Sequence, residues 1–139
     1  MRTREDILKQ MGDDRERIER ALDRMSPKQP EQRIAIMTCG RSARGCTAIT
    51  CAWAFQEKLY HFEQYANAAL PVQLCCIFPC NGCDSWENDD PGMRKKLDRL
   101  VLERVSRLHL STCMQKCPQL TQICALLDEY GLEWTLGTH

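Results

Sequence analysis

Apolar positions follow two different patterns on either side of residue 31. Over residues 3–25 they recur at helical spacing while most other positions are charged, which is typical of an amphipathic helix. The apolar positions near one stripe are Ile7, Leu8, Met11, Ile18, Leu22 and Met25. From residue 33 onward, short apolar runs alternate with helical patterns. We therefore divide the chain into a helix and linker over residues 1–31 and an α/β domain over residues 32–139.

The N-terminal pattern predicts one long helix over residues 3–25, interrupted only by Gly12. Its apolar stripe is too narrow for a helix buried in a core. We expect the helix to dock on the domain, or to pair with a second copy or with a partner protein. The run Ser26-Pro27-Lys28-Gln29-Pro30 contains two prolines and predicts an extended linker.

The domain pattern predicts four strands separated by helices. The expected strands are 33–38, 72–78, 106–112 and 132–136, the first two of them buried, and the expected helices are 47–67, 91–103 and 118–130. Asp90 and Pro91 are typical of a helix start, and Gly131 is typical of a helix end. This alternation predicts a three-layer α/β fold. We expect a mostly parallel four-stranded sheet flanked by helices, flavodoxin-like, with an extra N-terminal helix.

The charge balance and the length of the apolar stretches bear on which partners we expect. The 139 residues contain 19 basic and 19 acidic side chains, so no general nucleic-acid or anionic-membrane surface is indicated. No apolar stretch approaches the roughly 18 residues of a spanning helix, and the N-terminus is charged where a signal peptide would be apolar. We expect a cytoplasmic protein with no nucleic-acid or membrane partner.

Ten cysteines are many for a chain of this size. A disulfide framework suits small, loop-rich secreted domains, whereas here full strands and helices separate the cysteines. In a reducing compartment, clustered cysteines indicate metal ligation or redox catalysis. The sequence contains no glycine-rich phosphate loop, serine nucleophile elbow or paired-carboxylate motif. Whether the protein is an enzyme is left open.

Candidate ligands fall into four groups, each placed where a predicted strand ends. The groups are Cys39 with Cys46 and Cys51, Cys80-Asn81-Gly82-Cys83, Cys113 with Cys117-Pro118, and the closing Gly137-Thr138-His139. A parallel sheet gathers its carboxyl ends at one edge, which is where open α/β folds place their sites. The pattern predicts one cysteine-rich site at that edge.

The spacing of the cysteines leaves alternative interpretations open for the first two groups. Two helical residues five positions apart differ by about 140° around the axis, so either Cys46 precedes its helix or Cys46 and Cys51 serve different partners; Cys51 could also be a small core residue. The two-residue spacing of Cys80 and Cys83 suits a zinc or iron–sulfur site, and equally a redox dithiol. Alternatively, both could be free cysteines with only a structural role.

The place of each remaining residue in the predicted elements indicates whether it is a candidate ligand or a structural residue. Cys117 is expected to be the N-cap of the last helix, where the helix dipole favours a thiolate, and His139 would bring an imidazole near the fourth strand unless it is a tail. Four residues inside predicted elements are expected to be structural: Cys75, Cys76, His109 and Cys124. Arg41 and Arg44 could contact an anion near the site or be solvated loop residues.

Together, five separated motifs resemble those of the CGGC-domain family, small prokaryotic proteins for which metal binding is suggested. The motifs are Thr38-Cys39-Gly40-Arg41, Cys46-x4-Cys51, Cys80-x-Gly82-Cys83, Ser111-Thr112-Cys113-x3-Cys117-Pro118 and Gly137-Thr138-His139. The resemblance covers about residues 33–139 and implies a cytosolic α/β domain with a metal site. Asn81 replaces a glycine of the family motif, and asparagine tolerates positive φ well.

On this resemblance, the implied ligands are Cys39, Cys46, Cys51, Cys80, Cys83, Cys113, Cys117 and His139. Seven cysteines and a histidine exceed the four ligands of one tetrahedral zinc site, which favours two metal sites or an iron–sulfur cluster. Soft ligands exclude magnesium and calcium but do not separate zinc, iron–sulfur and copper(I). The alternatives are a thiol–disulfide oxidoreductase using Cys80 and Cys83 with Cys113 and Cys117 as a relay, and a metal or redox sensor acting through its N-terminal helix.

Overall fold

The structure, a computed structural model, describes residues 1–26 and 30–139. Its four strands are β1 (Gln32–Thr38), β2 (Val72–Pro79), β3 (Arg107–Leu110) and β4 (Glu133–Leu136). Its α-helices are α1 (Arg4–Gln10), α2 (Arg15–Met25), α3 (Ile49–Gln56), α4 (Cys83–Glu87), α5 (Pro91–Leu102) and α6 (Leu120–Glu129). Four short 3₁₀ helices are η1 (Gly12–Asp14), η2 (Ser42–Arg44), η3 (Tyr60–Tyr65) and η4 (Thr112–Met114).

One four-stranded sheet in the order β2-β1-β3-β4 forms the middle layer, and its three strand pairs are all parallel. This confirms the predicted α/β class and the flavodoxin-like arrangement. The strand expected to be buried at 72–78 is instead the edge strand β2, and Cys76 on it is exposed. The β1–β2 register shifts between Ile34 and Ala35, so that Leu74 and Cys76 are paired while Cys75 between them is not.

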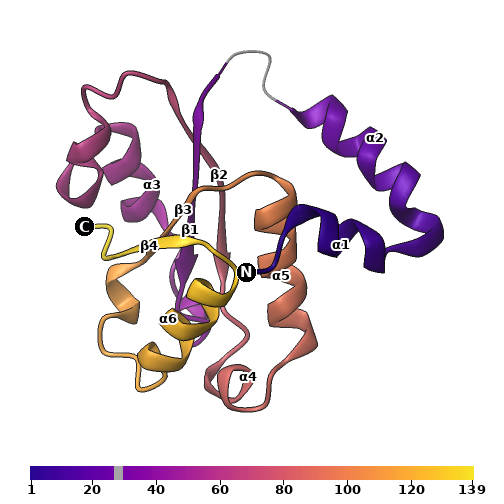
Figure 1. The fold of residues 1–139 in the computed structure, drawn as a ribbon. Helices are drawn as coiled ribbons and strands as arrows, with labels where there is room; N and C mark the ends of the chain where they lie inside the picture. The colour runs from indigo at the N-terminus through magenta and orange to yellow at the C-terminus, as the bar shows by residue number, and fades with distance from the viewer. Residues whose placement is uncertain (27–29) are drawn as a thin grey trace.

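Helices cover both faces of the sheet (Figure 1). On one face α5 and α6 pack Met93, Leu97 and Ile123 against β1 and β3. On the other face α3 and η3 pack Phe55 and Phe62 against Ile34 and Ile36 of β1. Parallel strands need long crossover connections, usually helical, because the chain must return from the end of one strand to the start of the next. The predicted three layers are confirmed.

The prediction of one helix over residues 47–67 is wrong in its extent. Helix α3 ends at Gln56, because Lys58 takes a left-handed conformation (φ 54°) and the Leu59 N–H turns back to the Ala54 carbonyl. The chain continues as η3, which buries Phe62 and leaves Tyr60 exposed. Ile49 and Trp53 of α3 are also exposed.

Helix ends elsewhere follow the sequence signals more closely. The Asp90 side chain accepts a hydrogen bond from the Met93 N–H at the start of α5, and Pro91 is its first residue, both as predicted. Gly131 ends α6 with φ 69°, and the Leu132 N–H bonds to the Leu127 carbonyl. Helix α6 begins at Leu120, however, and not at Pro118.

The N-terminal segment forms two helices where one was predicted. Gly12 adopts φ 55°, a conformation that an uninterrupted α-helix excludes, and the chain passes through η1 between α1 and α2. Ile7, Leu8 and Leu22 are buried together with Leu102 of α5, so the apolar stripe docks on the domain as expected. Figure 1 shows α1 beside α5 and α2 farther from the sheet. Pairing through residues 3–25 stays a prediction, and the predicted linker lies largely outside the described residues.

Candidate functional site

The loops after β1 and β3 meet at one point of the carboxyl edge. β1 and β3 are neighbours in the sheet, and the chain leaves them toward opposite sides, which makes this position the topological switch point where open α/β sheets bind ligands. Here the Cys39 N–H donates to the Cys113 sulfur at 3.3 Å, and the Ser111 hydroxyl lies 2.6 Å from the same sulfur. The first and third cysteine groups of the sequence are therefore in contact.

The second group joins them through the turn after β2. Gly82 adopts φ 100°, which glycine reaches without strain, and this lets Cys83 start α4 directly. Cys80 is buried, and its sulfur accepts a hydrogen bond of 3.2 Å from the Gly40 N–H. A Cβ on Gly40 would lie 2.3 Å from the Cys80 carbonyl oxygen. Glycine at position 40 therefore allows the loops after β1 and β2 to pack backbone against backbone.

Cys117 completes the first cysteine set, which we call the Cys80 cluster: Cys39, Cys80, Cys83 and Cys117. Burial raises the pKa of the Cys117 thiol, the Gln119 N–H lowers it, and negative charge on Cys83, Cys80 or Cys39 raises it further. Charges on these residues act on Cys117 only from the same part of the molecule, so the four cysteines share the carboxyl edge of the sheet. The expected N-cap role of Cys117 is wrong, because Gln119 holds that position and the balance of effects disfavours the Cys117 thiolate.

A second set adjoins Cys39 through Cys113, and we call it the Cys51 cluster: Cys46, Cys51 and Cys113. Burial raises the pKa of the Cys51 thiol, and negative charge on Cys113 or Cys46 adds to the rise. Cys51 is on α3, whereas Cys46 precedes that helix and is exposed. The first of the two alternatives for this pair is therefore confirmed, and Cys51 is both a core residue and a neighbour of the edge.

Cys39, the member of the Cys80 cluster that contacts Cys113 of the Cys51 cluster, has the environment of a stabilised thiolate. Burial raises its pKa, but hydrogen bonds from the Ser42 and Arg41 N–H groups, the Ser42 hydroxyl and the charge of Arg41 together lower it below the usual 9.0. N–H donors aimed at sulfur are typical of thiolates that ligate metals.

The C-terminal residues are held against the same loops. Thr138 is fully buried, and its hydroxyl lies 3.3 Å from the Cys51 sulfur. The Thr112 hydroxyl donates to the His139 carbonyl at 2.7 Å and accepts from the His139 N–H at 3.1 Å. The backbone of His139 is therefore fixed beside β3, while its exposed imidazole as a ligand stays a prediction.

Three hydroxyl residues of the site had no assigned role in the sequence: Ser111, Thr112 and Thr138. Each is a neighbour of a candidate ligand in the sequence and contacts a cysteine or the terminal residue in the structure. Their signal was present in the motifs Ser111-Thr112-Cys113 and Gly137-Thr138-His139, but spacing alone does not say which way a hydroxyl points.

His109, expected to be a core histidine, is fully buried in β3. Its Nε2 lies 2.7 Å from the Tyr65 hydroxyl, and burial lowers its pKa from 6.5 to about 4. Cys75 and Cys124, also expected to be structural, are half-buried against the core of α5 and α6, whereas Cys76 is exposed. Burial raises the pKa of the Cys75 and Cys124 thiols, and none of the three cysteines belongs to either cluster.

The chemistry of the donor atoms suits a soft metal, but the side chains that the structure describes are not arranged to hold one. All ten cysteines are free thiols in the structure. In residues 1–26 and 30–139, no three Cys, His, Asp or Glu side chains are placed to hold one metal ion. Cysteines brought to one edge by three loops match zinc, copper(I) or iron–sulfur chemistry. Closing a site would therefore require the cysteine side chains to turn toward one centre.

A comparison with protein families decides the classification, since the CGGC domain matches residues 33–139. This chain belongs to the CGGC domain family. The family suggests a metal-binding role for the CGGC domain, and the match leaves α1 and α2 outside it. No curated protein and no solved structure shows a significant match to the chain. In the part of the chain that the structure describes, no helix is both long enough and apolar enough to cross a membrane.

Proposed function

We propose that this CGGC-domain protein holds a metal ion or an iron–sulfur centre with cysteines at the carboxyl edge of its sheet. The Cys80 cluster supports the proposal most directly. Its members come from the loops after β1, β2 and β3, which no local sequence feature would bring together, and the Gly40 N–H already donates to the Cys80 sulfur. Hydrogen bonds to ligating sulfurs stabilise the thiolate and set the potential of an iron–sulfur cluster.

The Cys51 cluster supports a second or enlarged centre. The Cys39 backbone N–H donates to the Cys113 sulfur, so the two clusters adjoin and do not form separate sites at a distance. Four thiolates suffice for one tetrahedral zinc ion, and the additional cysteines exceed that need. Zinc and an iron–sulfur cluster are the two occupants we propose. A bound metal would supply either structural cross-linking of the loops or electron transfer.

Purification without oxygen, followed by metal analysis and absorption spectroscopy, tests this proposal. We expect stoichiometric zinc in a colourless protein, or iron and sulfide with absorption near 400 nm. The double variant Cys80→Ser/Cys83→Ser should lose this metal, because it removes two ligands of the Cys80 cluster. The matched control Cys76→Ser/Cys124→Ser removes the same number of thiols outside both clusters and should keep it. Equal metal content in both variants would contradict the assignment, with circular dichroism confirming that both are folded.

Thiol–disulfide exchange is a second candidate function, favoured by the turn that holds Cys80 and Cys83 at the ends of one four-residue motif. Cys80 is only 8% exposed and Cys83 is half-buried, so Cys83 would be the sulfur open to a substrate. A metal-free protein that forms a reversible Cys80–Cys83 disulfide would support this candidate and overturn the metal proposal. We place the protein in the cytoplasm, where reducing conditions would keep its thiols free.

A further inference from the structure

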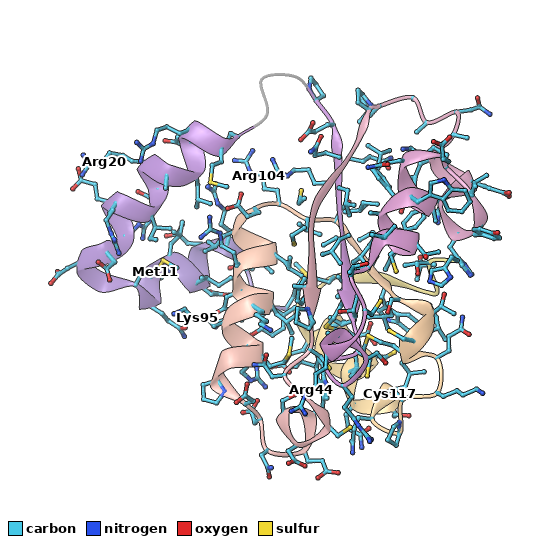
Figure 2. The ribbon with its side chains drawn as sticks, turned by 180° about the vertical axis from the view of Figure 1, so that it is seen from behind. Met11, Arg20, Arg44, Lys95, Arg104 and Cys117 are labelled. Atoms are coloured by element: carbon cyan, nitrogen blue, oxygen red, sulfur yellow. The ribbon has the colours of Figure 1, made fainter. Side chains whose placement is uncertain are left out.

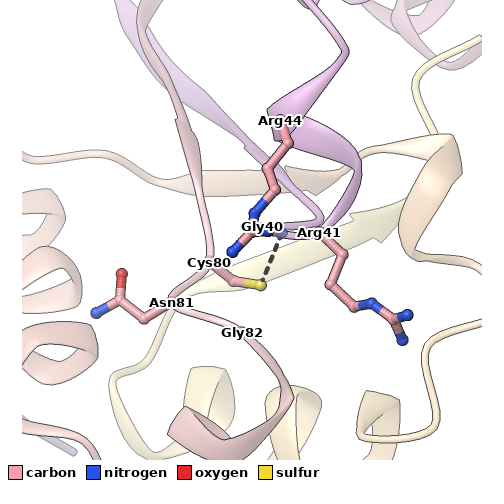
Figure 3. A pocket seen from close by; sticks show the side chains of 6 residues that line it. All are labelled: Gly40, Arg41, Arg44, Cys80, Asn81 and Gly82. Carbon is pink, nitrogen blue, oxygen red and sulfur yellow. Dashed lines mark hydrogen bonds between the residues drawn. The ribbon is translucent and has the colours of Figure 1, made fainter.

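Beside the Cys80 cluster lies a cavity of about 510 Å³ whose only charged lining residues among those described are two arginines. It lies between the loop after β1 and the turn after β2, and it is lined by Gly40, Arg41, Arg44, Cys80, Asn81 and Gly82. In Figure 3 the Arg44 side chain points toward Gly40 and Cys80, while Arg41 extends in another direction. Both arginines are exposed, so their guanidinium groups are open to a ligand.

No carboxylate in the described part of the chain pairs with these two arginines, although the charge of Arg41 also acts on the Cys39 sulfur. Within the described residues neither Arg41 nor Arg44 forms an ion pair or a side-chain hydrogen bond, whereas Arg17 and Arg20 of α2 each pair with a carboxylate. At the Asn81 wall, the Asp90 carboxylate accepts a hydrogen bond from the Asn81 amide, and Lys96 donates to the same amide. Those two opposite charges offset one another, which leaves the cavity with the excess positive charge of the arginines.

We infer that this cavity, lined by Arg41 and Arg44, binds a small molecule through an oxyanion group, a carboxylate or a phosphate, with Arg44 pointing toward the Gly40 and Cys80 wall. Guanidinium groups present planar, forked donors that match such oxyanions. The cavity is larger than a bare inorganic ion requires, and its wall includes Cys80, so the rest of the molecule would extend over the cysteine edge. The inference goes beyond metal binding and does not depend on which metal the cysteines hold.

Calorimetric titration of the protein as purified, at low ionic strength, tests the inference with two probes. Inorganic phosphate represents a free oxyanion, and S-methylglutathione represents an organic carboxylate with no free thiol to bind a metal. We expect at least one probe to bind, and Arg41→Gln/Arg44→Gln to weaken that probe roughly tenfold or more, as expected for lost hydrogen bonds to a charged group. Tighter binding of S-methylglutathione would identify an organic ligand, and tighter binding of phosphate a free ion.

The control variant Arg17→Gln/Arg20→Gln removes the same charge from α2 and should leave both dissociation constants unchanged. Equal weakening by the two double variants would reduce the effect to net charge and overturn the inference, as would the absence of binding by either probe. Metal content is measured on the same samples. A protein that keeps its metal but binds neither probe refutes the anion site alone, and a metal-free protein whose probe binding depends on Arg41 and Arg44 refutes the metal proposal alone.

Discussion

At the scale of single residues, His109 shows how burial converts an ionisable group into a pH-dependent contribution to stability. Its pKa of about 4 in the folded chain lies below the 6.5 of the unfolded chain, so the unfolded state binds the proton more tightly. This contribution is fully present above pH 6.5, is lost as the pH falls toward 4, and is constant below. The predicted loss is on the order of 3 kcal/mol in the free energy of unfolding.

Urea denaturation between pH 7.5 and pH 4.5 checks this prediction. His109→Gln keeps a polar group near the Tyr65 hydroxyl but does not titrate, so its stability should fall less than that of the native protein over this range. His61→Gln is the matched control, because His61 is exposed. Parallel stability curves for His109→Gln and the native protein would show that another group carries the pH dependence.

At the scale of elements, the contact between the loop after β1 and the turn after β2 determines the shape of the site. Gly40→Ala would place a Cβ 2.3 Å from the Cys80 carbonyl oxygen, and because both neighbours are backbone the loops must move apart. We expect a loss of about 1–3 kcal/mol in the free energy of unfolding. Displacement of Cys80 should also lower the metal content.

Gly45→Ala is the control for this change, since Gly45 has φ −124° and no atom lies within 4 Å of an added Cβ. Its free energy of unfolding should stay within about 0.5 kcal/mol of the native value. Urea denaturation and metal analysis of the two variants give the comparison. If Gly40→Ala keeps native stability and metal content, the close approach of the two loops is not required for the site.

Some boundaries of helices and strands are predictable from the sequence, and others are not. Strand positions and the start of α5 were predictable because apolar runs and the Asp90-Pro91 pair act locally. The end of α3 was not, because Lys58 adopts a left-handed conformation that its residue type does not announce. The edge position of β2 depends on strand order, which apolar composition does not encode.

At the scale of the whole molecule, topology explains why the shared location of the cysteines could be predicted from the sequence while their side-chain contacts could not. Parallel strands bring their carboxyl ends to one edge, so the joint location of the cysteine groups followed from their places in the sequence. The division into two adjoining clusters did not, because it depends on side-chain contacts such as Cys51 with Thr138 and Cys39 with Cys113. Figure 2 shows sulfur atoms gathered at the end of the sheet near Cys117 and Arg44, far from Arg20 on α2.

That separation predicts that the N-terminal helices can be released without loss of the cysteine site. Leu8 and Leu22 are buried against α5, whereas both cysteine clusters lie at the carboxyl edge. Leu8→Asp/Leu22→Asp places two charges in this contact, and an unpaired buried charge is strongly disfavoured, so α1 and α2 should detach. Trypsin should then cleave at the arginines of α2 many times faster than in the native protein, while metal content is unchanged. Glu16→Gln, an exposed change on α2, should leave the cleavage rate unaltered. Loss of metal from a folded Leu8→Asp/Leu22→Asp variant would show instead that the N-terminal helices and the cysteine edge are coupled, as a sensor acting through these helices would require.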